Sequence, residues 1–308
     1  MLHTITGKGK HMSVRIGLIG LGEVGSIFSK ALSDSGADIR VFDILLTQEN
    51  AREALAKRDL SDRVQFSPLR EVISESECIL SMVTTQVALK VASECRAFLK
   101  PGQIYFDLNS TSPAVKKQIC QVIEPSGAAF IEGAILGAVG ATGARTRILA
   151  CGDQGAKTAD LLSAAGLRVS FYSNEIGQAS MFKMLRSIFS KGLEALILEL
   201  MVAGTKAGIE KDLWEDVVEL MTNNPFDRTA ANWVRSHAVA FERRFHEMEQ
   251  VLETMLEIGV DPLMSAATES FFKRSTQLGF KEAFPQKPDS VQAVVNHMAR
   301  RLEELKTR

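Results

Sequence analysis

The stretch from Gly20 to Asp43 combines residue types that suit the binding of a phosphate-containing ligand. Glycines at positions 20, 22 and 25 follow a short apolar run and open an amphipathic stretch. Such glycines permit a tight turn, a close approach of backbone to a pyrophosphate and close packing of a helix on a strand, while the helix N-terminus attracts the anion. Asp43 ends a second apolar run 18 residues past Gly25, where an acid typically accepts the 2′-hydroxyl of a ribose. The spacing therefore predicts a dinucleotide site.

The acid at position 43 also indicates which dinucleotide binds. A carboxylate repels the 2′-phosphate of NADP, so Asp43 favours NAD. Arg40 and Arg52 lie near it in sequence and are able to serve a phosphate, so NADP stays an alternative.

Six polar residues recur in a regular pattern within the largely apolar segment 177–200. They recur at helical spacing, which places them along one stripe of a helix: Lys183, Arg186, Ser187, Ser190, Lys191 and Glu194. One interpretation is the solvated face of an amphipathic helix. The apolar arc is wider than a surface helix needs, however. We therefore expect a mostly buried helix whose polar stripe lines a cleft beside the dinucleotide site.

Lys183 has the chemistry of a general acid/base within this stripe. A hydride leaving a secondary alcohol requires a base for the hydroxyl proton, and a lysine serves when its pKa falls toward the operating pH. Two causes are expected to lower that pKa: desolvation in the cleft and the like charge of Arg186 one turn along the helix. Arg186, and Arg243 or Arg244, are candidates for holding an anionic substrate group.

Apolar periodicity predicts the elements that position these residues. Eight apolar runs alternate with helical stretches in the first half, which indicates an α/β fold with a Rossmann-type, doubly wound parallel sheet. The strands are expected at 14–19, 39–42, 64–66, 78–83, 103–108, 128–135, 145–150 and 167–171. Helical periodicity alone follows, at 177–208, 213–221, 229–233, 241–258, 263–278 and 290–306. We therefore predict a dinucleotide-binding Rossmann domain at 13–175 and an all-α domain for substrate binding and dimerisation at 176–308.

Polar segments after two strands fall where ligands bind on parallel sheets. Thr84-Thr85 follows the fourth strand and NSTSP, at 109–113, follows the fifth. Their side chains either contact the cofactor or cap the next helix. The glycine-rich segment 133–145, GAILGAVGATGAR, either lets backbone crowd a ligand or forms a mobile loop.

The composition argues against several classes of partner. A net charge of −1 gives no basis for a nucleic-acid or membrane partner, and no run of about 18 apolar residues marks a membrane span. The four cysteines are far apart and follow no metal-ligand spacing, so we expect no metal and a reduced, cytoplasmic chain. Residues 1–12 are expected to be either a disordered extension ahead of the fold or residues that are foreign to the natural protein.

Several segments resemble those of the β-hydroxyacid dehydrogenase superfamily, which includes 3-hydroxyisobutyrate and 6-phosphogluconate dehydrogenases. GLIGLGEVG from Gly17, SMVTT from Ser81 and DLNSTSP from Asp107 resemble its cofactor-binding segments. GQASMFKMLRS from Gly177 resembles its G-x-x-x-x-x-K-x-x-x-N segment. The resemblance covers nearly the whole chain and fits best a little-characterised, 6-phosphogluconate-dehydrogenase-like branch. It implies a Rossmann-type domain, a helical second domain and a homodimer.

The resemblance also implies roles for individual residues. It places Lys183 on the catalytic lysine, Ser187 on a substrate-binding Asn and His246 on a lysine of the substrate cleft. IEGAILGA, which begins at residue 131, stands for the D-x-P-V-S-G-G substrate loop, with Leu136 in place of Ser and Gly137 kept.

The predicted site residues fall into three groups. The catalytic residues are Lys183, Ser187 and His246, and the substrate-binding residues are Leu136, Gly137 and Arg186. The cofactor-binding residues are Gly20, Leu21, Gly22, Glu23, Val24, Gly25, Asp43, Val83, Thr84 and Ser110.

From these residues we predict an NAD(P)-dependent oxidoreductase. It transfers a hydride between the cofactor and a small, anionic β-hydroxy acid or related carbonyl compound, with Lys183 as general acid/base. The changes at Leu136, Ser187 and His246 rebuild the carboxylate-binding set, so the substrate is left open. The alternatives are an oxidative decarboxylase of a sugar acid, an imine reductase, whose members commonly lack the lysine, and a non-catalytic NAD(P)-binding sensor or partner protein.

Overall fold

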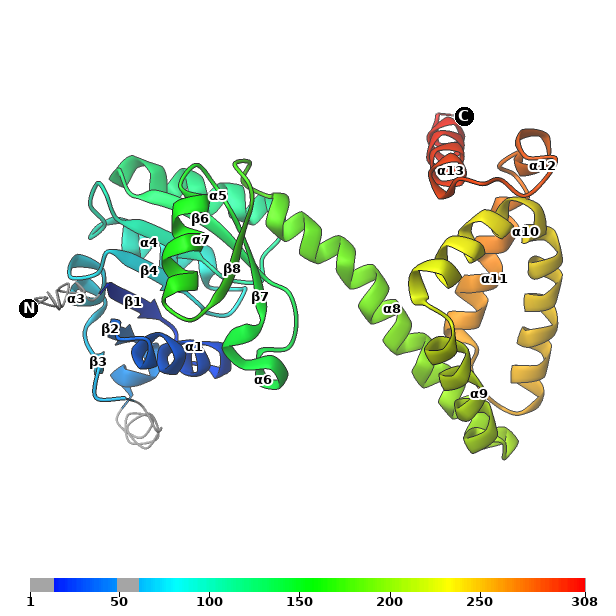
Figure 1. The fold of residues 1–308 in the computed structure, drawn as a ribbon, viewed down its shortest axis with the longest axis horizontal. Helices are drawn as coiled ribbons and strands as arrows, with labels where there is room; N and C mark the ends of the chain where they lie inside the picture. The colour runs from blue at the N-terminus through cyan, green and yellow to red at the C-terminus, as the bar shows by residue number, and fades with distance from the viewer. Residues whose placement is uncertain (1–13, 49–60, 308) are drawn as a thin grey trace, which may run out of the picture. The chain divides into compact units, whose positions relative to one another are not determined.

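The structure, a computed structural model, describes residues 14–48 and 61–307. The chain divides into two compact units, Met1–Ser187 and Ile188–Arg308, and the division falls inside the long helix α8, Gln178–Ala207. Within the described residues, the first unit holds the strands and the second is built from helices (Figure 1). The predicted extension at 1–12 and the candidate phosphate ligand Arg52 lie outside the described residues.

The described part of the first unit is organised around an eight-stranded sheet with the order β3-β2-β1-β4-β5-β6-β7-β8. The strands are β1 Arg15–Ile19, β2 Asp38–Phe42, β3 Val64–Phe66, β4 Cys78–Ser81, β5 Ile104–Asp107, β6 Ala129–Ile135, β7 Arg147–Cys151 and β8 Arg168–Ser173. Each overlaps a predicted run, because short apolar runs between turn residues suit strands that are buried on both faces. The strand order reverses between β1 and β4, which is the point where ligands bind on such sheets.

One strand pair departs from the predicted all-parallel sheet. β6 and β7 are antiparallel, with Gly133 opposite Ala150, whereas the other neighbouring pairs of the described sheet are parallel. A parallel return needs a crossover of about a dozen residues or more, usually through a full helix. The connection at 136–146 contains only the short helix α6, Val139–Thr142, and the 3-10 turn η3, Gly143–Arg145. The glycine-rich segment therefore turns the chain straight back along β6.

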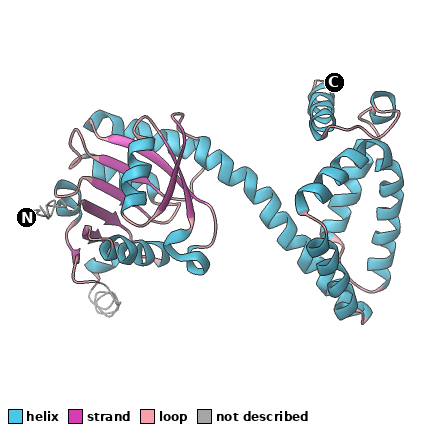
Figure 2. Ribbon diagram, viewed as in Figure 1, coloured by secondary structure: helices cyan, strands magenta, loops and turns pink. Residues whose placement is uncertain are grey.

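Helices cover both faces of the sheet (Figure 2). One face packs against α1, Glu23–Asp34, and α7, Gly155–Ala164; the other packs against α3, Leu69–Ser74, α4, Ala88–Arg96, and α5, Pro113–Ile123. Side chains alternate between the two layers: Ile104 and Phe106 of β5 enter the first and Tyr105 enters the second. Burial of each large apolar side chain contributes roughly 1.5–3 kcal/mol, so both layers hold the sheet rigid beneath its loops.

The second unit is helical throughout its described part. Its elements are the C-terminal portion of α8, α9 Glu210–Asn223, α10 Phe226–Glu257, α11 Leu263–Ser275, α12 Phe280–Ala283 and α13 Val291–Lys306. α10 is one continuous helix where the sequence predicts two, because polar residues at 235–237 interrupt the apolar pattern without disfavouring helical backbone. A core of Ala238, Phe241, Leu278, Phe280 and Val294 joins α10, α12 and α13.

The apolar face of α8 is exposed, which corrects the prediction of a mostly buried helix. Ile188 is 73% exposed, Leu185 57% and Phe189 55%. We call this surface the α8 patch; it consists of Met181, Met184, Leu185, Ile188, Phe189, Leu193, Leu196, Leu198 and Val202. The arc is wide, as expected, but much of it is exposed, although the ring of Phe189 contacts that of Phe226 edge-on. An exposed apolar surface of this kind marks an interaction site.

Candidate functional site

The Gly20–Gly25 turn has the geometry that its glycines predict. Gly20 has a φ of +94°, and a side chain there would collide with the carbonyl group of Met82. Gly25 packs on the carbonyl oxygen of Gly20 and leaves no room for a Cβ atom. A Cβ atom on Gly22 would meet no described protein atom within 4 Å. Since Gly22 is the N-cap of α1, backbone N–H groups at this open surface are available to an anion.

Asp43 is fixed beside this turn by backbone hydrogen bonds. Its Oδ2 accepts from the N–H of Leu21 at 2.7 Å and its Oδ1 accepts from the N–H of Leu45 at 2.9 Å. A carboxylate has about four acceptor positions, so Asp43 keeps capacity for ribose hydroxyls. Arg40, the described alternative ligand for a 2′-phosphate, donates to Ser67 Oγ at 3.3 Å.

A groove follows the carboxyl ends of the central strands. A cavity of about 540 Å³ is lined by the glycine turn, Asp43 and the residues after β4, and a second of about 340 Å³ continues to Ser110. The two share Val24, Met82, Val83 and Thr84, so they adjoin each other, and we call them together the groove. The predicted cofactor residues that line it are Gly20, Gly22, Glu23, Val24, Asp43, Val83, Thr84 and Ser110, while Leu21 and Gly25 are buried in the turn beneath.

Asn109 ties the loops after β4 and β5 together. Its Oδ1 accepts from the N–H of Val83 at 2.6 Å, and its Nδ2 donates to Ser81 Oγ at 3.0 Å. Ser112 accepts from the N–H of Val115 at 3.4 Å and caps α5. The expected helix cap is confirmed at Ser112, and Ser110 lines the groove.

Lys183 reaches the Ser110 end of the groove. Its Nζ donates to Ser110 Oγ at 2.6 Å. Burial lowers the pKa of Lys183, and the like charge of Lys116 lowers that pKa further. The sequence predicts Arg186 as the neighbouring cation, but the charge that acts comes from Lys116 on α5. A lysine with a lowered pKa is suited to exchange a proton with a bound molecule.

A buried carboxylate fixes the start of α8. Glu132 on β6 is fully buried and accepts from the N–H groups of Gly177 and Ser180, the latter at 2.6 Å. These groups belong to the helix N-terminus, whose N–H groups lack partners within the helix and where negative charge is favourable. Lys183 follows Ser180 by about one turn, so Glu132 sets the position of Lys183 over the sheet.

The predicted substrate residues of the first unit lie in two places. Arg186 and Ser187 follow Lys183 on α8, and Leu136 and Gly137 directly follow β6. Ser187 donates its hydroxyl to the carbonyl oxygen of Lys183 at 2.9 Å, so it bonds its own helix. Leu136 packs on a small apolar cluster of β6, β7 and α8. Gly137 is exposed with a φ of +147°, a conformation that favours glycine. Arg186 is also exposed.

His246 belongs to the helical unit. It lies exposed on α10, and its Nδ1 is 2.7 Å from Glu249 Oε2. Arg243 pairs with Glu247, and Arg244 donates to a serine hydroxyl about two turns earlier in the same helix. These three candidates therefore have partners on α10 itself.

Sequence reasoning missed residues that line or support the groove. Ile44 and Leu45 directly follow Asp43, line the larger cavity and are 64% and 37% exposed. Two large apolar residues on a turn beside a predicted ligand acid are a signal that a contact surface continues there. Lys116 and Glu132 carried no such signal, because a single sequence does not distinguish a buried ion from a surface charge.

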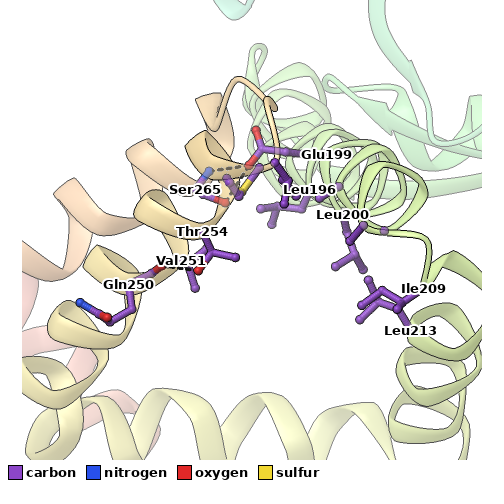
Figure 3. A pocket seen from close by; sticks show the side chains of 14 residues that line it. Leu196, Glu199, Leu200, Ile209, Leu213, Gln250, Val251, Thr254 and Ser265 are labelled. Atoms are coloured by element: carbon purple, nitrogen blue, oxygen red, sulfur yellow. Dashed lines mark hydrogen bonds between the residues drawn. The ribbon is translucent and has the colours of Figure 1, made fainter.

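The helical unit holds a separate cavity of about 640 Å³ (Figure 3). Apolar side chains of α8, α9 and α10 line it, among them Leu196, Leu213 and Val251. The carboxylate of Glu199 accepts hydrogen bonds from the backbone N–H groups of Met264 and Ser265 and from the hydroxyl of Ser265. Burial alone raises the pKa of Glu199, but these bonds outweigh burial and lower that pKa. Glu199 is thus a cap of α11 rather than a proton donor.

Three further features bear on the kind of protein. Among residues 14–48 and 61–307, no group of three His, Cys, Asp or Glu side chains is arranged to hold a metal ion. None of the helices described is long and apolar enough to cross a membrane. The four cysteines, all within the described ranges, are free thiols, and burial raises the pKa of Cys78 and Cys95 to about 12.

Residues 15–173 match the protein family described as the NAD binding domain of 6-phosphogluconate dehydrogenase. Residues 205–275 match a family described as a domain of unknown function.

Individual proteins resemble the chain in sequence or, for the solved structures, in fold. An uncharacterised 28.5 kDa protein of Methanothermus fervidus is 27% identical over 260 residues, which are 84% of this chain and 98% of that protein. The mitochondrial 3-hydroxyisobutyrate dehydrogenase of Homo sapiens is 24% identical over 212 residues, 67% of this chain and 61% of that protein. An imine reductase of Myxococcus stipitatus, solved as a variant with NAD⁺, has a TM-score of 0.75 at 19% identity over 93% of this chain and 100% of that chain. The same reductase with NADP⁺ has a TM-score of 0.74.

Proposed function

The chain belongs to the β-hydroxyacid dehydrogenase superfamily, and we propose that it oxidises or reduces a small β-hydroxy acid or related carbonyl compound with NAD. The members of this superfamily are NAD(P)-dependent dehydrogenases and reductases. The observation that carries this proposal is the hydrogen bond from Lys183 to Ser110 at the end of the groove. It brings a lysine with a lowered pKa to the place where the reacting end of a dinucleotide is expected.

The residues of the groove fit an extended dinucleotide. The Gly20–Gly25 turn holds the pyrophosphate on backbone N–H groups, and Asp43 accepts a ribose hydroxyl. Ile44 and Leu45 supply apolar surface for the adenine, and Val83, Thr84 and Ser110 contact the nicotinamide end. The bound cofactor supplies a donor or acceptor for hydride. The fixed carboxylate of Asp43 favours NAD over NADP.

Lys183 moves the proton that accompanies the hydride. During oxidation its neutral amine accepts the proton of the substrate hydroxyl, and during reduction its ammonium returns a proton to the carbonyl oxygen. Ser110 Oγ, which accepts from Nζ, holds the amine in place. The lowered pKa enlarges the fraction of neutral amine near neutral pH, which supports the role of a base.

The substrate is assigned by chemistry rather than by name. Arg186, exposed one turn beyond Lys183, and the backbone at Gly137 are proposed to hold an anionic group. Leu136 presents an apolar side chain where the family has a hydroxyl, and Ser187 spends its hydroxyl on the backbone of α8. We therefore assign a substrate that needs fewer polar contacts near Leu136 than hydroxyisobutyrate or phosphogluconate. His246 remains a proposed additional proton or hydrogen-bond donor.

The experiment is a two-step assay of the purified chain. NADH and NADPH are first titrated by fluorescence, and a panel of β-hydroxy acids, sugar acids, carbonyl compounds and imines is then followed at the absorbance band of the reduced cofactor. Oxidation or reduction of a hydroxy or oxo acid, with tighter binding of NADH than NADPH, supports the proposal.

A second candidate function rests on Leu136 and Ser187, whose side chains replace those of the family's substrate set. Tight nucleotide binding without turnover of any panel member indicates an NAD(P)-binding sensor and contradicts the proposed enzyme. Release of CO₂ with the hydride transfer places the reaction among oxidative decarboxylations.

A homodimer is also proposed, since the α8 patch leaves a broad apolar surface uncovered in the described chain. Leu196 belongs to that patch and also lines the cavity of Figure 3. A second copy of the chain presents matching apolar side chains, and isologous contacts of this kind are the commonest in soluble oligomers.

A further inference from the structure

A buried cation lies in the helix that directly follows the Ser110 loop. Lys116, in the first turn of α5, is 0% exposed. Its Nζ donates to the carbonyl oxygens of Asp107 at 2.8 Å and Gly133 at 3.1 Å, and it lies 3.3 Å from Asp107 Oδ1. Burial of an ammonium group costs several kcal/mol unless the charge is paired and hydrogen-bonded. The buried ammonium of Lys116 is therefore expected to have a role that depends on its charge or on its three contacts.

The contacts of Lys116 join the two strands that lead into the site. β5 passes through Asp107 into the loop that carries Ser110, and β6 passes through Gly133 toward Leu136. Asp107 is paired in register with the residue before Gly133, so Lys116 binds the two strands at adjacent positions of the ladder. Asp107 Oδ1 also accepts from the N–H of Asn109 at 2.8 Å. One ammonium group therefore fixes the backbone immediately before Ser110.

The charge of Lys116 also acts on Lys183 directly. Burial is the larger cause of the lowered pKa of Lys183, and Lys116 is the charged group that adds to it. The other charged side chains on these elements are Asp107 of β5, Glu132 of β6, Lys117 of α5 and, on α8 itself, Arg186, Lys191, Glu194, Glu199 and Lys206. Of these, Asp107 is the partner that holds the Lys116 ammonium in place.

We propose that Lys116 is a positioning residue that fixes the backbone leading into the Ser110 loop, to which Lys183 is hydrogen-bonded, and keeps a second positive charge near the Lys183 amine. The inference rests on the function proposed for Lys183. It extends that function, because it assigns the position and the protonation of the Lys183 amine in part to a residue outside the groove.

The test measures the reactivity of the Lys183 amine and requires no turnover. Trace acylation of the intact protein by acetic anhydride at a series of pH values, read by peptide mass spectrometry, reports the neutral fraction of Lys183. In Lys116→Met the like charge is gone, so the profile is expected to shift to higher pH and acylation near neutral pH to fall severalfold. Lys116→Arg keeps the charge and is expected to restore the profile. Lys117→Met removes an exposed cation from the same helix and serves as the control with an unchanged profile.

A second variant covers the case in which Lys116→Met fails to fold because Asp107 is left buried without its partner. Asp107→Asn combined with Lys116→Gln removes both charges but keeps groups that form hydrogen bonds. An upward shift in the same direction but of smaller size is expected, because the lost Asp107 carboxylate acts in the opposite sense to the lost ammonium. An unchanged Lys183 profile in either folded variant overturns the proposal. Failure of both variants to fold assigns Lys116 a purely structural role and overturns it as well. A wild-type protein without turnover contradicts the proposed function instead, because the Lys183 profile is measured without substrate.

Discussion

Gly22 and Gly25 stand three residues apart in one turn but meet different surroundings. A Cβ atom at Gly25 collides with the carbonyl oxygen of Gly20, whereas a Cβ atom at Gly22 meets no described protein atom within 4 Å. We therefore expect Gly25→Ala to lower the free energy of unfolding by about 1–3 kcal/mol. Gly22→Ala is expected to leave stability unchanged and to weaken NADH binding by about tenfold or more, because its methyl group occupies the path of the pyrophosphate. Thermal unfolding and NADH titration of the two variants check this, and unchanged NADH affinity in Gly22→Ala contradicts it.

Single residues differ in how well their roles follow from the sequence. The glycine turn and Asp43 are predicted because turn geometry and anion binding depend on local spacing. Lys116 and Glu132 are not, because their burial and partners arise from residues that are brought together only by the sheet. The neighbour that shifts the pKa of Lys183 is wrongly predicted for the same reason: helical spacing points to Arg186, and the fold supplies Lys116.

At the scale of elements, the position of α8 depends on Glu132. This carboxylate accepts from two N–H groups at the start of the helix and is fully buried. Glu132→Ala is expected to lower the free energy of unfolding by about 2–4 kcal/mol, because both buried donors lose their partner. Hydrogen exchange at 177–187 is expected to accelerate in the same variant. Glu175→Gln changes an exposed carboxylate just before α8 and is the control; equal exchange rates in the two variants contradict the role of Glu132.

The helical unit contains a buried histidine, His237, which is expected to make the stability of this unit depend on pH. Burial lowers the pKa of His237 from 6.5 to about 4, and the charge of Arg244 adds to the effect. Between these two pH values the folded state binds fewer protons than the unfolded state. The free energy of unfolding therefore decreases as the pH falls from 6.5 to 4 and increases as the pH is raised from 4 to 6.5. The expected loss is about 1–3 kcal/mol.

Chemical denaturation of the chain at pH values across this range measures the effect. His237→Phe is expected to flatten the pH dependence, and His246→Gln, which changes an exposed histidine of the same helix, is expected to keep it. The same slope in His237→Phe as in the wild type contradicts the assignment.

The elements themselves are largely predictable from apolar periodicity, and their pairing is less so. All eight strands of the described sheet overlap predicted runs, yet the antiparallel pairing of β6 with β7 depends on a short connection whose helical turns the glycine pattern conceals. α10 is longer than predicted because apolar spacing reports burial rather than backbone conformation. The exposure of α8 could not be predicted from the sequence. A wide apolar arc indicates that a helix has an apolar partner, but it does not distinguish the same chain from a second molecule as that partner.

At the scale of the whole molecule, the α8 patch predicts association of two chains. Light scattering coupled to size exclusion is expected to give twice the 33.7 kDa of the chain. Ile188 is 73% exposed, so Ile188→Glu is expected to preserve the fold and to yield a monomer, because a buried unpaired charge opposes association. Lys191→Glu, a change of charge on the polar stripe of the same helix, is the control. A wild-type chain that elutes as a monomer contradicts the homodimer.

The central claim is that Lys183 exchanges the proton that accompanies hydride transfer in the NAD groove. Its most direct test compares wild type and Lys183→Met with the best substrate of the panel, in one preparation that measures both NADH binding and turnover. We predict that the variant binds NADH with nearly wild-type affinity and loses turnover by about a thousandfold, in line with the loss of a general acid/base. Turnover retained by Lys183→Met would contradict the account.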